Sequence, residues 1–83
     1  MSAPVDASFS MLVMSVASSA AFALGLSPHP QTGEVQKDKE MARFNIDLLV
    51  ILKEKTKNNL SQDESQLLDH LISDLQLKFL QFK

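Results

Sequence analysis

The chain has 83 residues and a formal net charge of −2, and it contains no cysteine, tryptophan or tyrosine. One domain of this size buries a small fraction of its surface, and without cysteine neither a disulfide nor a thiolate metal site can stabilise it, so tight helix packing or oligomerisation is expected. The mild acidity and the few aromatic residues argue against nucleic-acid binding, which needs a basic face or stacking platforms.

The first predicted element is a helix over residues 7–26, a stretch with no charged residue. Ser8 or Asp6 can cap its start, and Gly25 suits a left-handed residue after its end. A rotation of about 100° per residue divides the helix into two sides. The denser apolar side holds Phe9, Val13, Val16, Ala17, Ala20, Ala23 and Leu24. The opposite side holds Met11, Met14, Ser15, Ser18, Ser19, Phe22 and Leu26. Because neither side is charged, burial on more than one side is expected.

Three interpretations of this helix compete. A secretory signal peptide needs a positive charge before its apolar run, and none is present here. A transmembrane span needs about 20 apolar residues and flanking positive charge, whereas this stretch is rich in serine and alanine and the first lysine is Lys37. A core helix shared between subunits fits best, since small residues permit close approach and methionine fills irregular gaps.

Residues 27–36 are predicted to be a linker. Pro28 and Pro30 end the first helix, and Pro30 to Gly33 suits a turn. This connection is long for a helical bundle. We therefore expect that it allows the first helix to pack on a neighbouring chain.

Two amphipathic helices, over residues 38–57 and 61–82, are predicted to form an antiparallel hairpin, because their connection is short. Asp38 suits the start of the first, and Asn58 can end it in the left-handed conformation. Ser61 and Glu64 form a capping box at the start of the second. The first carries two adjoining apolar stripes: Ala42, Ile46, Leu49, Leu52 and Met41, Phe44, Leu48, Ile51. The second carries one seam: Leu68, Ile72, Leu75, Phe79 and Phe82. Leu77 and Leu80 lie off that seam and require another partner.

No catalytic, cofactor or metal site is predicted. His70 lies beside carboxylates on a helix surface and His29 lies in the linker, so each is better explained as a solvated side chain than as a ligand. The serines of the first helix have no nearby base. Lys53 and its neighbouring lysines could hold an anion, but they also suit the negative end of their helix.

A family resemblance covers nearly the whole chain. The residues that carry it are Phe9-Ser10-Met11, Met14-Ser15, Ala20 to Leu24-Gly25, Pro30, Thr32-Gly33, Ile46-Asp47-Leu48-Leu49, Leu52-Lys53-Glu54-Lys55-Thr56-Lys57, Asn59-Leu60, Glu64, Leu67-Leu68 and Leu75. They resemble a small bacterial family catalogued as domain of unknown function 1844. Asn58 and Gln76 depart from that pattern, where Gly and Arg are expected. The resemblance implies a short cytoplasmic helical protein and no particular activity.

The sequence therefore predicts an all-α protein of three helices, packed as a homo-oligomeric bundle, with a dimer as the base-rate stoichiometry. We expect a non-catalytic interaction or scaffold module, without cofactor, nucleic acid or metal. The predicted oligomer interface comprises Phe9, Met11, Met14, Val16, Ser18, Phe22, Leu26, Leu77 and Leu80. Two alternatives stay open: membrane association through the first helix, and binding of a small apolar ligand in a channel lined by Met11, Met14 and Phe22.

Overall fold

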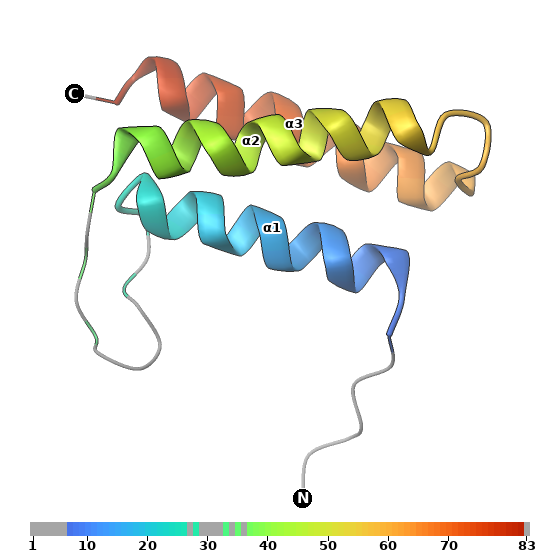
Figure 1. The fold of residues 1–83 in the computed structure, drawn as a ribbon, viewed down its shortest axis with the longest axis horizontal. Coiled ribbons are helices and arrows are strands. Elements are labelled where there is room, and N and C mark those ends of the chain that lie inside the picture. The colour runs from blue at the N-terminus through green and yellow to red at the C-terminus, as the bar shows by residue number, and fades with distance from the viewer. Residues whose placement is uncertain (1–6, 27, 29–32, 34, 36, 83) are drawn as a thin grey trace, which may run out of the picture.

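The predicted all-α architecture is confirmed. The computed structural model describes residues 7–26, 28, 33, 35 and 37–82. Its helices are α1 (Phe9–Ala23), α2 (Lys39–Lys55) and α3 (Gln62–Leu80) (Figure 1). Each helix begins and ends one to three residues inside its predicted range. The N-cap residues Ser8, Asp38 and Ser61 have extended backbone conformation, so each helix begins one residue after its cap.

Side chains cap the start of every one of these helices. Ser8 and Asp38 each accept a hydrogen bond from the backbone N–H three residues later, at 3.1 Å. At the start of α3 the capping box is complete: Ser61 Oγ accepts from the Glu64 N–H at 3.2 Å, and Glu64 Oε1 accepts from the Ser61 N–H at 2.9 Å. These bonds satisfy backbone donors that have no partner inside the helix.

Left-handed residues follow α1 and α2, as the sequence indicated. Gly25 has φ +77° and Asn58 has φ +70°. Asparagine tolerates this region better than other residues with a side chain, since its short amide can bond locally. The chain therefore reverses direction immediately after α2, and α3 begins only a few residues later.

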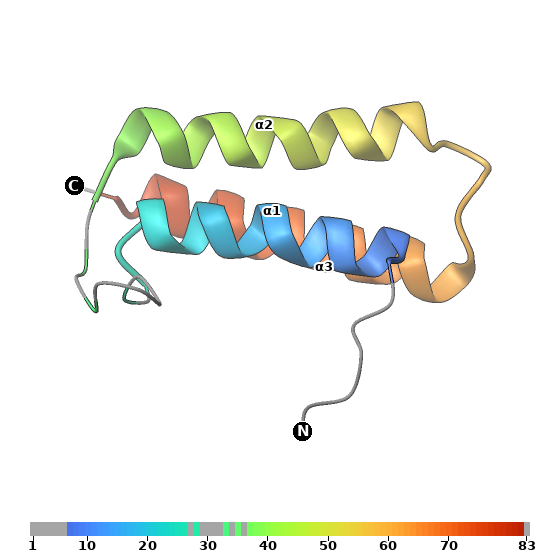
Figure 2. The ribbon, with the colours of Figure 1, turned by 60° about the horizontal axis from the view of Figure 1, so that its bottom comes forward.

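Helices α2 and α3 form the predicted antiparallel hairpin, and α1 lies against both of them. Figure 1 shows α1 running opposite to α2 and in the same direction as α3. Figure 2 shows α1 in front of α3 and below α2, so that the three helices lie at the corners of a triangle. Each pair of helices makes contact. A single core therefore runs along the axis between them.

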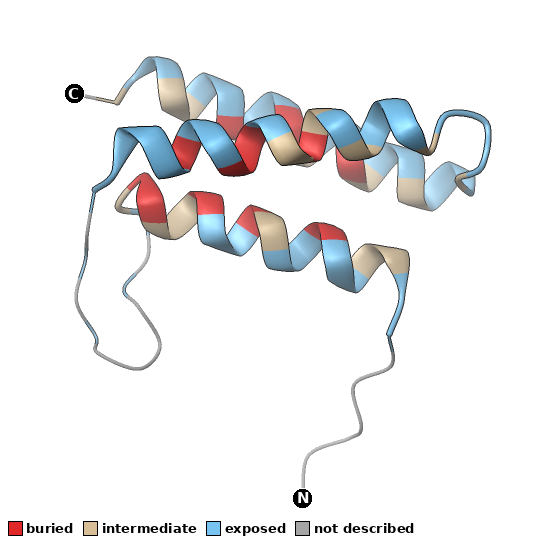
Figure 3. Ribbon diagram, in the orientation of Figure 1, coloured by how far each residue is buried: buried red, intermediate tan, exposed pale blue. Residues whose placement is uncertain are grey.

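One stripe of each helix builds this core. The buried apolar residues are Val13, Ala17, Ala20, Ala23 and Leu24 from α1 and its cap, Ala42, Ile46 and Leu49 from α2, and Leu68, Ile72 and Leu75 from α3 (Figure 3). Val13, Leu49 and Leu68 are fully buried, and burial of each contributes about 1.5–3 kcal/mol. The alanines of α1 let its backbone approach α2 closely. The predicted core seams of all the helices are thus confirmed.

The base of the linker fastens α1 to its own chain, which corrects one expectation. Leu24 forms an antiparallel bridge with Lys37, and the Asp38 N–H donates to the Ala23 carbonyl at 2.7 Å. The linker was expected to let α1 pack on a neighbour. Instead, its denser apolar side packs on α2 and α3 of the same chain, so only its outer side is available to a neighbour. The predicted turn from Pro30 falls largely outside the described residues.

Asn45 is a buried polar residue of α2 whose burial the sequence did not predict. It is only 6% exposed. Its Nδ2 donates to the Met41 carbonyl at 2.9 Å, so one of its polar atoms is satisfied within its own helix. Burying an amide without a partner would cost stability, and this local bond offsets that cost.

Candidate interaction surface

The outer side of α1 is exposed and uncharged. Met11 and Met14 are exposed large apolar residues, as is their neighbour Leu12, and Leu26 is exposed just beyond the helix. Ser15, Ser18 and Ser19 lie on the same outer side and are also exposed. Figure 3 shows the buried residues of α1 on the side toward α2 and the exposed residues away from it. The helix thus presents a solvent-facing side without any charge to keep it hydrated.

The serines on this side have already bonded their own helix. Ser15 Oγ donates to the Met11 carbonyl at 2.9 Å, and Ser19 Oγ donates to the Ser15 carbonyl at 3.2 Å. A hydroxyl that is satisfied in this way can be covered by another surface with little loss of hydrogen bonding. These serines therefore act as small, nearly neutral packing residues.

A second exposed apolar stripe lies on α2. It consists of Met41, Phe44, Leu48 and Ile51 at spacings of 3, 4 and 3, which places the four on one side of the helix. Met41, Phe44 and Ile51 are each about half exposed, and Leu48 is partly buried. The sequence predicted these residues as a second apolar stripe of this helix, but it did not assign them to the oligomer interface.

Leu77 and Leu80 are exposed on α3, and Leu80 is 81% exposed. Leu80 lines a shallow groove of about 330 Å³ between α2 and α3. The other residues of this groove are Arg43, Ile46, Asp47, Gln76 and Phe79. Two charged side chains, Arg43 and Asp47, line the groove beside its apolar residues. Their atoms Arg43 Nε and Asp47 Oδ2 lie 3.9 Å apart. Asp47 is thus an exposed residue paired within its own helix.

The nine predicted interface residues fall into two groups in the single chain. Met11, Met14, Ser18, Leu26, Leu77 and Leu80 are exposed. Phe9, Val16 and Phe22 are partly buried, and the first two pack against the core of their own chain. Exposure leaves the first group available to a partner. Whether they form an interface stays a prediction.

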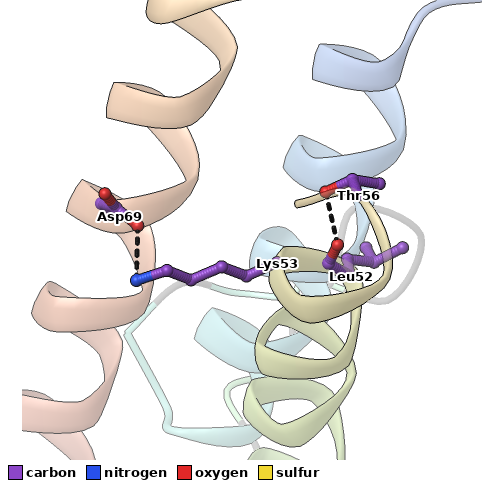
Figure 4. A network of polar contacts seen from close by, with 4 residues as sticks. All are labelled: Leu52, Lys53, Thr56 and Asp69. Carbon is purple, nitrogen blue, oxygen red and sulfur yellow. Dashed lines mark hydrogen bonds and ion pairs between the residues drawn. The ribbon is translucent and has the colours of Figure 1, made fainter. Parts of the chain in front are cut away.

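The end of the hairpin forms a polar cleft of about 540 Å³. Lys53 Nζ lies 2.8 Å from Asp69 Oδ1, and Thr56 Oγ1 donates to the Leu52 carbonyl at 2.6 Å (Figure 4). Lys57 also lines the cleft. The anion role considered for these lysines loses support, since Lys53 is engaged by a carboxylate. Sequence reasoning missed this pair because its members lie on different helices.

Neither of these clefts corresponds to the apolar channel considered for a ligand. Both are lined by residues other than Met11, Met14 and Phe22. Within the described residues, no group of three or more His, Cys, Asp or Glu side chains could hold a metal ion. His70 is exposed, and His29 lies outside the described residues. The apolar surfaces of α1 and α2 are therefore the best-developed candidate site.

These features define a small all-α protein, a helical hairpin covered by one additional helix. The family described as Domain of unknown function (DUF1844) matches residues 6–81, and the chain belongs to this family. The resemblance seen in the sequence is thereby confirmed over nearly its full extent. No curated protein and no solved structure matches the chain.

The possibility of a membrane-spanning helix was raised by the uncharged N-terminal stretch. Over the part of the chain that the structure describes, no helix is both long enough and apolar enough to cross a membrane. The helical part of that stretch, α1, has 15 residues, whereas a span needs about 20.

Proposed function

We propose that this protein is a non-catalytic helical interaction module that works as a homo-oligomer, with a dimer as the simplest form, in the bacterial cytoplasm. A cysteine-free sequence is compatible with a reducing compartment. The partner in this proposal is a second copy of the same chain, and the protein needs no cofactor.

One observation carries the proposal: the outer side of α1 is apolar or small and lacks charge from residue 7 to residue 26. Scattered exposed hydrophobic residues are ordinary on a monomer. A continuous uncharged helix side is different, because a solvated helix normally carries charged residues opposite its core. Contiguous exposed apolar surface is typical of interaction sites.

The size of the chain supports the same conclusion. Among the described residues, eleven buried apolar side chains form the core of one chain, and five of them come from α1 or its cap. Four of those eleven are alanines, which bury little area each. Small domains with few large core residues commonly gain stability from oligomerisation. Covering the outer side of α1 would add apolar burial that one chain does not supply.

Sedimentation velocity of the untagged protein across the micromolar range tests this function. We expect a species heavier than one chain, with the fraction of heavier species rising with concentration. A well-folded monomer at every concentration would reject the proposal. Recovery only in a detergent-extracted membrane fraction would instead favour membrane association.

A further inference from the structure

The two flanks of α2 face different helices. One flank faces α3, since Lys53 pairs with Asp69, and Lys39 Nζ lies 5.8 Å from the centroid of the Phe79 ring. The groove that contains Leu80 opens on this same flank of α2. Residues on the other flank of α2 must therefore lie toward α1.

The exposed stripe of α2 runs from that other flank to the side of α2 opposite the core. With about 100° of rotation per residue, Ala42 and Leu49 define a buried line along α2. Lys39 and Lys53 lie on one side of this line. Met41, Phe44 and Leu48 lie on the other side. Phe44 is 55% exposed, and Met41 and Ile51 are close to half exposed. Met41 and Leu48 therefore border α1, whereas Phe44 and Ile51 lie further round α2, on its solvent-facing side.

A matching stripe of α1 lies beside it. Leu12, Val16, Ser19 and Ala23 follow one another at spacings of 4, 3 and 4, which places them on one flank of α1. This flank leads toward α2, since the Ala23 carbonyl accepts from the N–H of Asp38, the cap of α2. Leu12 is about half exposed and Ser19 is exposed.

These stripes and the adjoining ridge of α1 form one surface, which we name the α1–α2 face. Its members are Met11, Leu12, Ser15, Val16 and Ser19 from α1, and Met41, Phe44, Leu48 and Ile51 from α2. None of them is ionisable. Leu80, on α3, lies in the groove beside the other flank of α2. One two-fold contact through the α1–α2 face therefore does not include Leu80.

We propose that the α1–α2 face is the dimer interface, that its occupant is the same face of a second copy, and that Leu77 and Leu80 lie outside it. This inference rests on the homo-oligomeric function proposed above and assigns that function to one surface. A two-fold contact sets a surface against itself, so any charge on it meets its own kind near the axis. An uncharged face avoids that repulsion, whereas a charged partner would gain no ion pair from it.

The face supplies a large part of the area that a stable dimer interface needs. Its five most exposed large side chains are Met11, Leu12, Met41, Phe44 and Ile51. At roughly 200 Å² for a full large side chain and exposure near one half, they present about 500 Å². The smaller and half-buried members raise this toward the roughly 800 Å² that each partner contributes to a standard interface.

Two substitutions of equal exposure test the assignment. Phe44 on the face and Leu77 on α3 are each 55% exposed, so Phe44→Glu and Leu77→Glu introduce the same charge at matched sites. We expect light scattering to give the mass of one chain for Phe44→Glu and the wild-type mass for Leu77→Glu, with helical circular dichroism retained in both. Monomeric Leu77→Glu beside oligomeric Phe44→Glu would overturn the inference and leave the proposed function standing. A monomeric wild type would overturn both.

Single cysteines provide a second readout that does not depend on tolerance of a charge. The chain has no native cysteine, so Ile51→Cys and Leu77→Cys each carry one thiol. We expect a maleimide to label Ile51→Cys several-fold more slowly in concentrated than in dilute protein, and Leu77→Cys at one rate throughout. Protection of Leu77→Cys alone, or equal labelling of both at a concentration where the protein is oligomeric, would contradict the assignment.

Discussion

Helices α1 and α3 run in the same direction and each gives one apolar stripe to the core, yet their outer sides differ completely. The exposed residues of α3 include Asp63, Asp69, His70 and Asp74, and Lys78 pairs with Asp74 at 3.5 Å. The outer side of α1 carries methionines and serines without a charge. Packing in the core accounts for the apolar residues on the inner side of each helix. It does not account for the absence of charged residues on the outer side of α1, which α3 does carry on its outer side.

The difference has an energetic consequence for association. Covering the outer side of α3 would take several charges out of water, which costs several kcal/mol per unpaired ion. Covering α1 requires no such desolvation, and Ser15 and Ser19 keep their hydrogen bonds within the helix. Association through α1 is therefore much less costly than association through the outer side of α3.

The largest effect is expected from a charge on the core side of α1. Val16 is partly buried and packs against the core, so Val16→Asp would place a carboxylate against apolar residues without a partner. We expect loss of the cooperative unfolding transition in a thermal melt followed by circular dichroism. A wild-type melting temperature in this variant would mean that Val16 has little contact with the core.

A smaller but well-defined loss is expected in α3. Leu68 is fully buried and Leu77 is exposed on the same helix. Leu68→Ala should lower the free energy of unfolding by about 2–5 kcal/mol, because it removes apolar contacts and leaves a cavity. Leu77→Ala should change it by about 0.5 kcal/mol or less. Urea denaturation of both variants checks the difference, and equal losses would contradict the burial pattern.

Two exposed serines compare the outer sides directly. Ser19 lies on α1 within the α1–α2 face and Ser73 lies on α3, and both are exposed. Ser19→Asp should weaken dimerisation about tenfold or more, roughly 1.4 kcal/mol, since it adds charge to the uncharged face. Ser73→Asp should leave the dissociation constant unchanged. Sedimentation equilibrium measures both constants, and an equal response would show that the two outer sides are equivalent.

Two glycines isolate the contact at the end of α1. Gly25 and Gly33 both have positive φ. An added Cβ at Gly25 would lie 2.8 Å from Lys37 Cγ, whereas an added Cβ at Gly33 would have no neighbouring heavy atom within 4 Å. Substitution by alanine should cost roughly 1–2 kcal/mol at either position for the backbone conformation. Gly25→Ala should cost more, because Lys37 must also move. Thermal melts would refute this if Gly33→Ala proved the more damaging change.

The smallest effects concern the helix caps. Ser61→Ala breaks the reciprocal pair with Glu64, while Ser8→Ala removes a single bond at the start of α1. Each should destabilise by about 0.5–2 kcal/mol, with Ser61→Ala toward the upper end. Guanidinium denaturation of the two variants gives the order, and a larger loss at Ser8 would contradict it.

Local features were predictable from the sequence because their causes are local. The caps at Ser8 and Ser61 and the left-handed Gly25 and Asn58 depend only on residues a few positions away. The buried seams were predictable because helical periodicity fixes which residues share a side. The burial of Asn45 escaped prediction, since an amide inside an apolar pattern can equally face water.

Relations between helices were not predictable in the same way. Periodicity gives angles within one helix, but it does not say which flank of α2 faces which neighbour. The Lys53–Asp69 pair and the Leu24–Lys37 bridge join distant parts of the chain. For the same reason Leu80 was grouped with the residues of α1, although the structure places it in a groove between α2 and α3.

The dependence of the melting temperature on protein concentration tests the central claim most directly, namely that the inner side of α1 serves the core of its own chain and the outer side serves association. If association stabilises the fold, the wild-type melting temperature must rise with concentration by mass action. We predict this rise for the wild type and a smaller rise for Ser19→Asp, with helical content preserved in both. A wild-type melting temperature that is independent of concentration would contradict the account.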